Sequence, residues 1–266
     1  MSQGYLVMAQ GNYAKQAEYL AASIRATQSK VSGISVITDQ PVDHALFDHV
    51  IALPEHDMAV GADWKIHNRA QFLDLTPYNE TVILDADMLF LTDVSHWWNN
   101  FTHYDLLLTN RVQTYRGNWV EQSPYRKTFV DNQLPNVYSA FVYFKRNERA
   151  REFFDLVKSI ITNWDTWTNA YAHESKQNWP SMDVAMAMAV KILDWEDSVT
   201  SNRDYPTFTH MKSGCQGWRT YSEDWRVHLD SYTANKQLKL GNYVQSGILH
   251  YVVKDFVTQP IMEIFN

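Results

Sequence analysis

The first 90 residues alternate between apolar, β-branched runs and segments whose apolar side chains recur at helical spacing. The apolar runs predict strands at residues 4–10, 33–39, 48–54 and 81–90. Between them, residues 12–27 and 64–75 carry apolar side chains three and four positions apart, as amphipathic helices do. This alternation predicts an α/β fold with a mostly parallel, Rossmann-like sheet, helices on both faces, and ligands at the carboxyl ends of the strands.

The second half continues this pattern up to about residue 197 and is irregular from there to residue 247. Apolar runs predict strands at residues 104–109, 136–147 and 247–253, and helical spacing predicts helices at 148–164 and 181–195. The chain has no internal repeat and no low-complexity linker. We therefore predict a single domain spanning residues 1–266.

Composition excludes several classes of protein. The net charge of -7 disfavours a protein that coats nucleic acid by charge alone. Cys215 is the only cysteine, which excludes an internal disulfide framework and a cysteine zinc site and favours a reducing compartment. No run reaches the roughly 18 to 20 apolar residues of a membrane span. We expect a cytoplasmic protein without a membrane span.

The stretch TVILDADMLF, residues 81–90, ends a strand in two neighbouring carboxylates. On an extended strand Asp85 and Asp87 point to the same side, where their mutual repulsion calls for a positive partner. A hard divalent cation, Mn or Mg, meets that need and would bridge protein oxygens to the phosphates of a nucleotide. The alternative is a pair of capping or turn aspartates, which are common at strand ends.

The aspartates stand inside a longer pattern, HNRAQFLDLTPYNETVILDADMLFLTDVSHWW. This pattern, together with LVMAQGNYAKQAEYLAASIRA, NVYSAFVYFKRN, SMDVAMAMA and ILHYVVKDF, resembles retaining glycosyltransferases of the glycogenin and lipopolysaccharide galactosyltransferase type, family 8. The resemblance implies the A-type glycosyltransferase fold, that of a nucleotide-diphospho-sugar transferase. It also implies a nucleotide-binding part at about residues 1–110 and an acceptor-side part at about 111–266.

The resemblance assigns the metal and diphosphate residues. It implies that Asp85, Asp87 and His250 bind the divalent metal and that Lys254 contacts the diphosphate, where a cation stabilises a leaving group. The stretch reads HYVVKD, without the glycine and the proline of the family. Without the resemblance, His250 reads as a strand histidine satisfied by a backbone carbonyl and Lys254 as a solvated lysine.

The nucleotide is expected near the first strand and the helix before the aspartates. The resemblance implies that Ala9 and Gln10 hold the base, that Tyr13 stacks on uracil, and that Arg69 bridges donor sugar and phosphate. Lys65 lies one helical turn before Arg69 and is expected to face the same ligand. The alternatives are a core position for Tyr13 and a solvated cationic face for the two basic residues.

Asp183 is the one acid that we place near the donor sugar, and we predict that it and Arg69 are catalytic. It opens a helix, where the helix dipole also favours a carboxylate for structural reasons alone. The family's D-Q-D reads SMD here and its N-A-G reads SAF. Because both differences fall on the sugar side, the resemblance says least about the donor sugar and the acceptor.

Three functions follow from these observations. The first is metal-dependent transfer of a sugar, with retention, from a nucleoside diphosphate, predicted to be UDP, to the hydroxyl of a glycan, glycoside or protein. The second differs only in its acceptor, a hydroxymethylated base in DNA. The third is a nucleotide-sugar-binding module without turnover. The DNA acceptor is suggested by basic and aromatic residues in one stretch, namely Arg111, Arg116, Arg126, Lys127, Tyr115, Trp119 and Tyr125.

Overall fold

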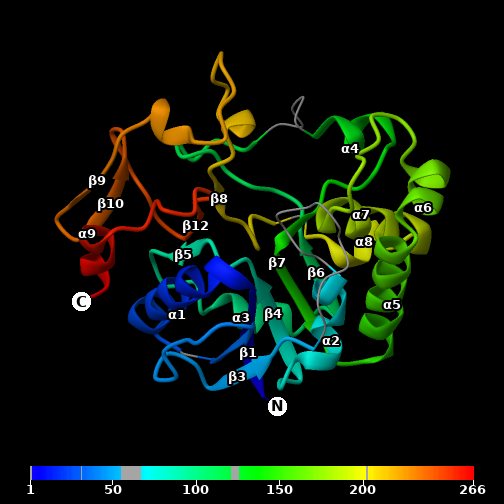
Figure 1. The fold of residues 1–266 in the computed structure, drawn as a ribbon, viewed down its shortest axis with the longest axis horizontal. Helices are drawn as coiled ribbons and strands as arrows, with labels where there is room; N and C mark the ends of the chain where they lie inside the picture. The colour runs from blue at the N-terminus through cyan, green and yellow to red at the C-terminus, as the bar shows by residue number, and fades with distance from the viewer. Residues whose placement is uncertain (1, 31, 55–66, 121–125, 202) are drawn as a thin grey trace.

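A computed structural model describes residues 2–30, 32–54, 67–120, 126–201 and 203–266. Within these ranges, six strands form a twisted central sheet at the core of the molecule (Figure 1). In spatial order they are β3 (His49–Ala52), β2 (Gly33–Thr38), β1 (Gln3–Ala9), β4 (Glu80–Leu84), β7 (Tyr138–Lys145) and β6 (Leu106–Thr109). The sheet is parallel except for β7, which is antiparallel to both of its neighbours.

The two faces of the sheet are covered by different helices, because side chains alternate along each strand. On β1, Leu6 packs into one core together with apolar residues of α5 and α7, whereas Tyr5 and Val7 pack into a second core with α1 and α3. The predicted α/β sheet with helices on both faces is therefore confirmed. The α-helices of the described chain are α1 (Ala14–Thr27), α2 (Phe72–Leu75), α3 (Trp97–Phe101), α4 (Lys127–Asp131), α5 (Glu148–Thr162), α6 (Trp164–Tyr171), α7 (Met182–Leu193), α8 (Glu196–Val199) and α9 (Gln259–Met262).

The long helices begin and end at residues suited to those positions. The side chain of Asn147 caps α5 by accepting a hydrogen bond of 3.0 Å from the backbone N–H of Ala150. Asp194, which follows α7, has a left-handed backbone (φ 54°) that ends the helix. Short 3-10 helices occur as η1 (Gly11–Tyr13), η2 (His67–Gln71), η4 (Ser213–Cys215), η5 (Trp225–Val227) and η6 (Glu263–Phe265).

Two smaller sheets extend the molecule beyond the central sheet (Figure 1). β5 (Met88–Phe90), β12 (Ile248–His250) and β8 (Thr209–His210) form one, with β12 antiparallel to β5 and parallel to β8. β9 (Ser231–Ala234), β10 (Gln237–Leu240) and β11 (Tyr243–Val244) form an antiparallel sheet in the C-terminal part. The first of these sheets matters most, because β5 follows β4 directly and β12 comes from the C-terminal region.

The structure corrects two predicted elements. The strand predicted for residues 81–90 is two strands, β4 and β5, which belong to different sheets and are separated by a turn. The described part of the helix predicted for residues 64–75 is a 3-10 helix followed by the short α2. Within the described ranges, no helix combines the length and apolar character that a bilayer crossing requires. The single-domain organisation and the cytoplasmic location stay predictions.

Candidate metal and nucleotide site

The acidic turn lies between β4 and β5, at the carboxyl edge of the central sheet. Asp85 and Asp87 are separated by one residue and lie outside both strands, so the turn brings them together rather than strand alternation. The backbone N–H of Asp85 donates to the carbonyl of Ala140 on β7 at 3.1 Å, which fixes the start of the turn against the sheet. The predicted convergence occurs, by a different geometry from the one expected.

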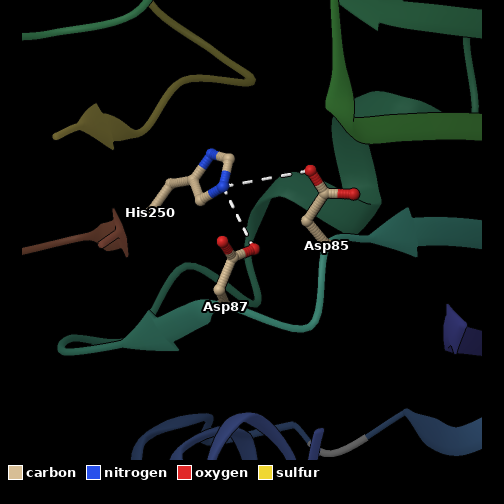
Figure 2. Close-up of side chains that lie close together, drawn as sticks. All are labelled: Asp85, Asp87 and His250. Atoms are coloured by element: carbon tan, nitrogen blue, oxygen red, sulfur yellow. Dashed lines mark hydrogen bonds and ion pairs between the residues drawn. The ribbon is translucent and has the colours of Figure 1, made fainter. Parts of the chain in front are cut away.

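His250 reaches this turn because β12 pairs with β5. In that pairing His250 lies opposite Met88, and the backbone N–H of Tyr251 donates to the carbonyl of Asp87 at 3.1 Å. The Nε2 atom of His250 lies 3.1 Å from Oδ1 of Asp87 and 3.9 Å from Oδ2 of Asp85 (Figure 2). One ligand atom from each of the three residues lies within 4.8 Å of the other two.

Opposite charges hold this cluster together. Burial alone would raise the pKa of Asp87, but the charge and hydrogen bond of His250 outweigh burial and lower it. Burial likewise would lower the pKa of His250, whereas Asp87 beside it raises that pKa. Arg69, from η2, forms an ion pair with Asp85. Each carboxylate therefore has a basic side chain of the protein beside it.

The three residues fit a divalent cation. Two carboxylates and one imidazole suit Mn or Mg, which prefer oxygen ligands and accept an imidazole nitrogen. The Nε2 atom of His250 already faces both carboxylates, as a shared ligand position requires. The ring's Nδ1 atom is buried and has no hydrogen-bond partner among the described residues. The turn between β4 and β5, together with β12, thus supplies metal ligands of the right chemistry.

A cavity of about 860 Å3, called here the first cavity, opens beside this cluster. Its described lining includes most of the residues that the sequence predicted for the site, namely Gln10, Tyr13, Arg69, Asp85, Asp87, Asp183, His250 and Lys254. Ala9 is fully buried in the core at this end of β1 and is not part of the described cavity lining, so the structure does not bring it to the site. Lys65 lies outside the described residues.

The predicted base-binding residues lie together at the start of α1. The Lys254 ammonium lies 4.8 Å from the centre of the Tyr13 ring, and the Gln16 side chain donates to the Lys254 carbonyl at 2.8 Å. Gly11 adopts a positive φ of 54°, and its N–H donates to Asp39 at 2.8 Å. Asp39, which also lines the cavity, was missed by sequence reasoning although GISVITD ends in an aspartate as TVILD does.

Asp183, in the first turn of α7, lies in a network of hydrogen bonds. Its carboxylate accepts from the N–H and hydroxyl of Ser139, at 2.8 and 2.7 Å, and from Arg126 at 2.8 Å. Burial would raise the pKa of Asp183, but the charge of Arg126 and the two bonds from Ser139 outweigh it and lower that pKa. Asp183 is thus held as an ionised group at the wall of the first cavity.

The prediction that Arg126 contacts DNA phosphate is wrong. Its side chain is 3% exposed, donates to the Val137 carbonyl at 2.6 Å, and packs against Phe129 with its guanidinium carbon 3.5 Å from the ring centre. A guanidinium enclosed in this way, and paired with Asp183, cannot reach a nucleic acid at the surface.

The other basic residues of that stretch are exposed but engaged with their own neighbours. Arg111 pairs with Asp204 and lies over Trp119, and Lys127 pairs with Asp131. Arg116 packs on Tyr115 and donates to its hydroxyl at 2.9 Å. Tyr125 lies outside the described residues. The described residues therefore give no support to a basic track for DNA.

The structure adds two residues to the site that the sequence did not predict. His210, on β8, is buried with its ring centre 4.9 Å from that of His250, and burial holds its pKa well below the usual value. Lys212 lines the first cavity two residues later. Both lie where the sequence pattern is irregular, and the FTHMK stretch carries little signal beyond its short apolar character.

Comparison with known proteins was informative only at the level of structure. No protein-family model and no curated protein matched the sequence. Among solved structures, an active-site mutant of LgtC is 11% identical, with a TM-score of 0.55, and the match covers 98% of this chain and 93% of that one. Mouse xyloside xylosyltransferase 1 in its apo form is 9% identical, with a TM-score of 0.52 and coverage of 86% and 90%.

A third structure, the galactosyltransferase LgtC in complex with donor and acceptor sugar analogues, is 11% identical with a TM-score of 0.50. That match covers 79% of this chain and 76% of that one. These likenesses confirm the predicted A-type glycosyltransferase fold.

Proposed function

We propose that the chain is a metal-dependent glycosyltransferase that moves a sugar, with retention, from a nucleoside diphosphate, UDP, to a hydroxyl acceptor. The observation that carries the proposal is the convergence of Asp85, Asp87 and His250, within 4.8 Å of one another, beside the first cavity. The fold adds support, because its solved likenesses are glycosyltransferases and one of them was solved with donor and acceptor sugar analogues.

The residues of the first cavity suit a bound nucleotide sugar. In this proposal Tyr13 stacks on the base, as its place on the cavity wall permits, and Lys254 beside it contacts the diphosphate. In the same proposal Arg69, which is paired with Asp85 and lines the cavity, contacts the phosphate next to the donor sugar. A divalent ion held by the Asp-Asp-His cluster would neutralise charge that develops on the leaving diphosphate.

Asp183 fits a positioning role better than that of a nucleophile. Three hydrogen bonds, two from Ser139 and one from Arg126, occupy its carboxylate and stabilise the ionised form. An acceptor hydroxyl would therefore be oriented by this carboxylate, whereas attack by the same oxygens would sacrifice those bonds. Retention would then proceed by attack of the acceptor from the face that the diphosphate leaves.

The experiment measures release of UDP from a panel of UDP-sugars, with Mn or Mg and with excess chelator. We expect metal-dependent hydrolysis or transfer for at least one donor, reduced on the order of 100-fold in Asp87→Asn, since the variant keeps the shape of the side chain and loses a ligand charge. Asp155→Asn is the control, because Asp155 is exposed on α5 and away from the cavity lining. Full activity in chelator, or in Asp87→Asn, would contradict the proposal.

The same assay separates the other two predicted functions. A binding module would bind UDP with Mn and release none from any donor. A version of the assay with labelled donor sugars offers hydroxymethylcytosine DNA, plain DNA and simple sugars as acceptors. The hypothesis of a DNA acceptor requires label on the modified DNA alone.

A further inference from the structure

A second cavity, of about 910 Å3, shares the lining residue Lys212 with the first cavity. Its described walls come from two segments, residues 114–120 and 212–221. The chemically informative residues among them are Trp119, Lys212, Trp218, Arg219 and Tyr221. Nothing in the donor chemistry proposed above uses this cavity.

The two walls are tied to each other by hydrogen bonds. Residues 112–120 form a hairpin, closed by bonds of 2.9 Å from Val120 N–H to the Val112 carbonyl and 2.8 Å from Thr114 N–H to the Asn118 carbonyl. The buried side chain of Gln216 donates to the His210 carbonyl at 2.6 Å and accepts from the backbone N–H of Tyr115 at 3.3 Å. One amide thus joins the hairpin to the opposite wall, so the cavity is formed before any ligand arrives.

The rings of the cavity are also held in place. Trp218 contacts the rings of Tyr115 and His228, with ring centres 6.0 and 5.0 Å away. The Arg111 guanidinium lies 4.1 Å from the centre of the Trp119 ring. Tyr221, at 60% exposed, stands at the surface of the same cavity. Rings fixed in this way offer large apolar faces at little cost in side-chain entropy, which suits stacking against the rings of a ligand.

The two cavities differ in charge. Lys212 and Arg219 are the charged residues in the described lining of the second cavity, and neither side chain forms a hydrogen bond or ion pair with a described residue. The described lining of the first cavity contains five carboxylates, those of Asp39, Asp85, Asp87, Asp183 and Glu223, against the three cations of Arg69, Lys212 and Lys254. Within a chain of net charge -7, the second cavity is therefore a local basic site next to an acidic one.

We infer that the second cavity binds the acceptor, and that this acceptor is a glycoside or oligosaccharide with an anionic group, a phosphate, sulfate or carboxylate, beyond its accepting sugar. The inference rests on the proposed glycosyltransferase function. Sugar rings pack on Trp119 and Trp218, Arg219 pairs with the anionic group, and the accepting hydroxyl passes Lys212 toward Asp183 in the first cavity. Nucleic acid is disfavoured, because strand binding needs a track of free cations and Arg126, Arg111 and Lys127 are paired.

The test compares anionic sugars with their neutral counterparts in calorimetric titrations, in the presence of UDP and Mn. The probes are trehalose 6-phosphate against trehalose, and a sulfated heparin tetrasaccharide against maltotetraose. We expect at least one anionic probe to bind roughly tenfold more tightly than its neutral counterpart, and Arg219→Gln to abolish that preference. Lys158→Gln, which removes an exposed cation on α5, should leave the preference unchanged.

A second variant tests the aromatic wall. Trp119→Ala should weaken the binding of the preferred anionic probe and of its neutral counterpart by a similar factor, on the order of tenfold. The reason is that stacking does not depend on the charge of the ligand. Tyr232→Ala is the matched control, because Tyr232 is a half-exposed ring with Lys239 over it, on β9 and outside both cavities.

The outcomes separate the two proposals. UDP binding and metal-dependent donor hydrolysis should persist in Arg219→Gln and Trp119→Ala; if they are absent from the unmodified protein, the proposed function itself has failed. If hydrolysis is present but neither anionic probe is preferred, or Arg219→Gln leaves the preference intact, the acceptor inference is refuted. A hydroxymethylcytosine oligonucleotide that binds more tightly than every sugar, and loses affinity in Arg219→Gln, would refute it in favour of nucleic acid.

Discussion

Replacing Arg126 by methionine should destabilise the protein by about 3 kcal/mol, the lower end of the cost of breaking a buried ion pair. Methionine keeps much of the apolar packing against Phe129 and Tyr138, whose ring centres lie 3.5 and 4.2 Å from the guanidinium carbon. It removes the 2.8 Å bond to Asp183 and leaves that carboxylate without its cation. We expect the lower end of this range of destabilisation because the Asp183 side chain is 30% exposed, so that water can solvate it in part.

Urea unfolding at pH 7, followed by circular dichroism, measures this loss as a change in the free energy of unfolding. Lys127→Met is the control, since Lys127 and Asp131 form an exposed pair worth at most about 1 kcal/mol. A double-mutant cycle of Arg126→Met with Asp183→Asn should give a coupling above about 1 kcal/mol. The burial of Arg126 would be refuted if its replacement cost no more than that of Lys127.

The same pair predicts how stability depends on pH. Burial would raise the pKa of Asp183, but Arg126 and Ser139 lower it below the usual value of 3.8, so the unfolded chain binds more protons than the folded one in this range. The carboxylate therefore stabilises the fold above pH 3.8, and this contribution is lost as the pH falls through the lower, folded pKa. The stability gap between the unmodified protein and Asp183→Asn should be constant near neutral pH and shrink in acid; a gap that widened in acid would contradict the assignment.

Three further predictions concern the nucleotide, the metal and the core. Tyr13→Ala should weaken UDP binding by about 1 to 3 kcal/mol in calorimetry, and unchanged affinity would exclude stacking on the base. Mn affinity should fall as the pH drops through the pKa of His250, because a protonated imidazole cannot bind a metal. Burial would lower this pKa, but Asp87 beside the ring raises it. A pH-independent Mn affinity would exclude His250 as a ligand. Gly4→Ala should destabilise the fold by about 1 to 3 kcal/mol, since its Cβ would overlap the Tyr78 ring, and Tyr78→Ala should remove most of that penalty in urea unfolding.

The elements of the central sheet could be predicted because each strand carries its own local signal. The apolar runs that became β1, β2 and β7 are continuous and are bounded by polar residues, as buried strands are. The split of TVILDADMLF into β4 and β5 could not be read in the same way. That split depends on the pairing of β5 with β12, whose residues lie more than 150 positions away in the chain.

Contacts between residues far apart in the sequence also limited what could be predicted of the site. Asp85 and Asp87 are neighbours in the sequence, so their convergence was expected from the residues alone. His250 came only from the resemblance, because a histidine in ILHYVV looks like one satisfied in a core. Arg126 was assigned to the surface because its partner, Asp183, lies 57 residues further on and nothing local indicates the burial.

The protein itself supplies a positive partner to Asp85 before any metal binds. Arg69 forms an ion pair with Asp85, so a divalent ion has to compete with this cation for the carboxylate, whereas His250 beside Asp87 would become a ligand of the ion. An Arg69 side chain displaced from Asp85 is free to pair with phosphate, and a diphosphate also supplies oxygen ligands to the ion. We therefore expect Mn and UDP to strengthen each other's binding, and linkage requires the two factors to be equal. Calorimetric titration of each ligand with and without the other measures both factors, and independent binding would show that the Arg69–Asp85 pair does not oppose the metal.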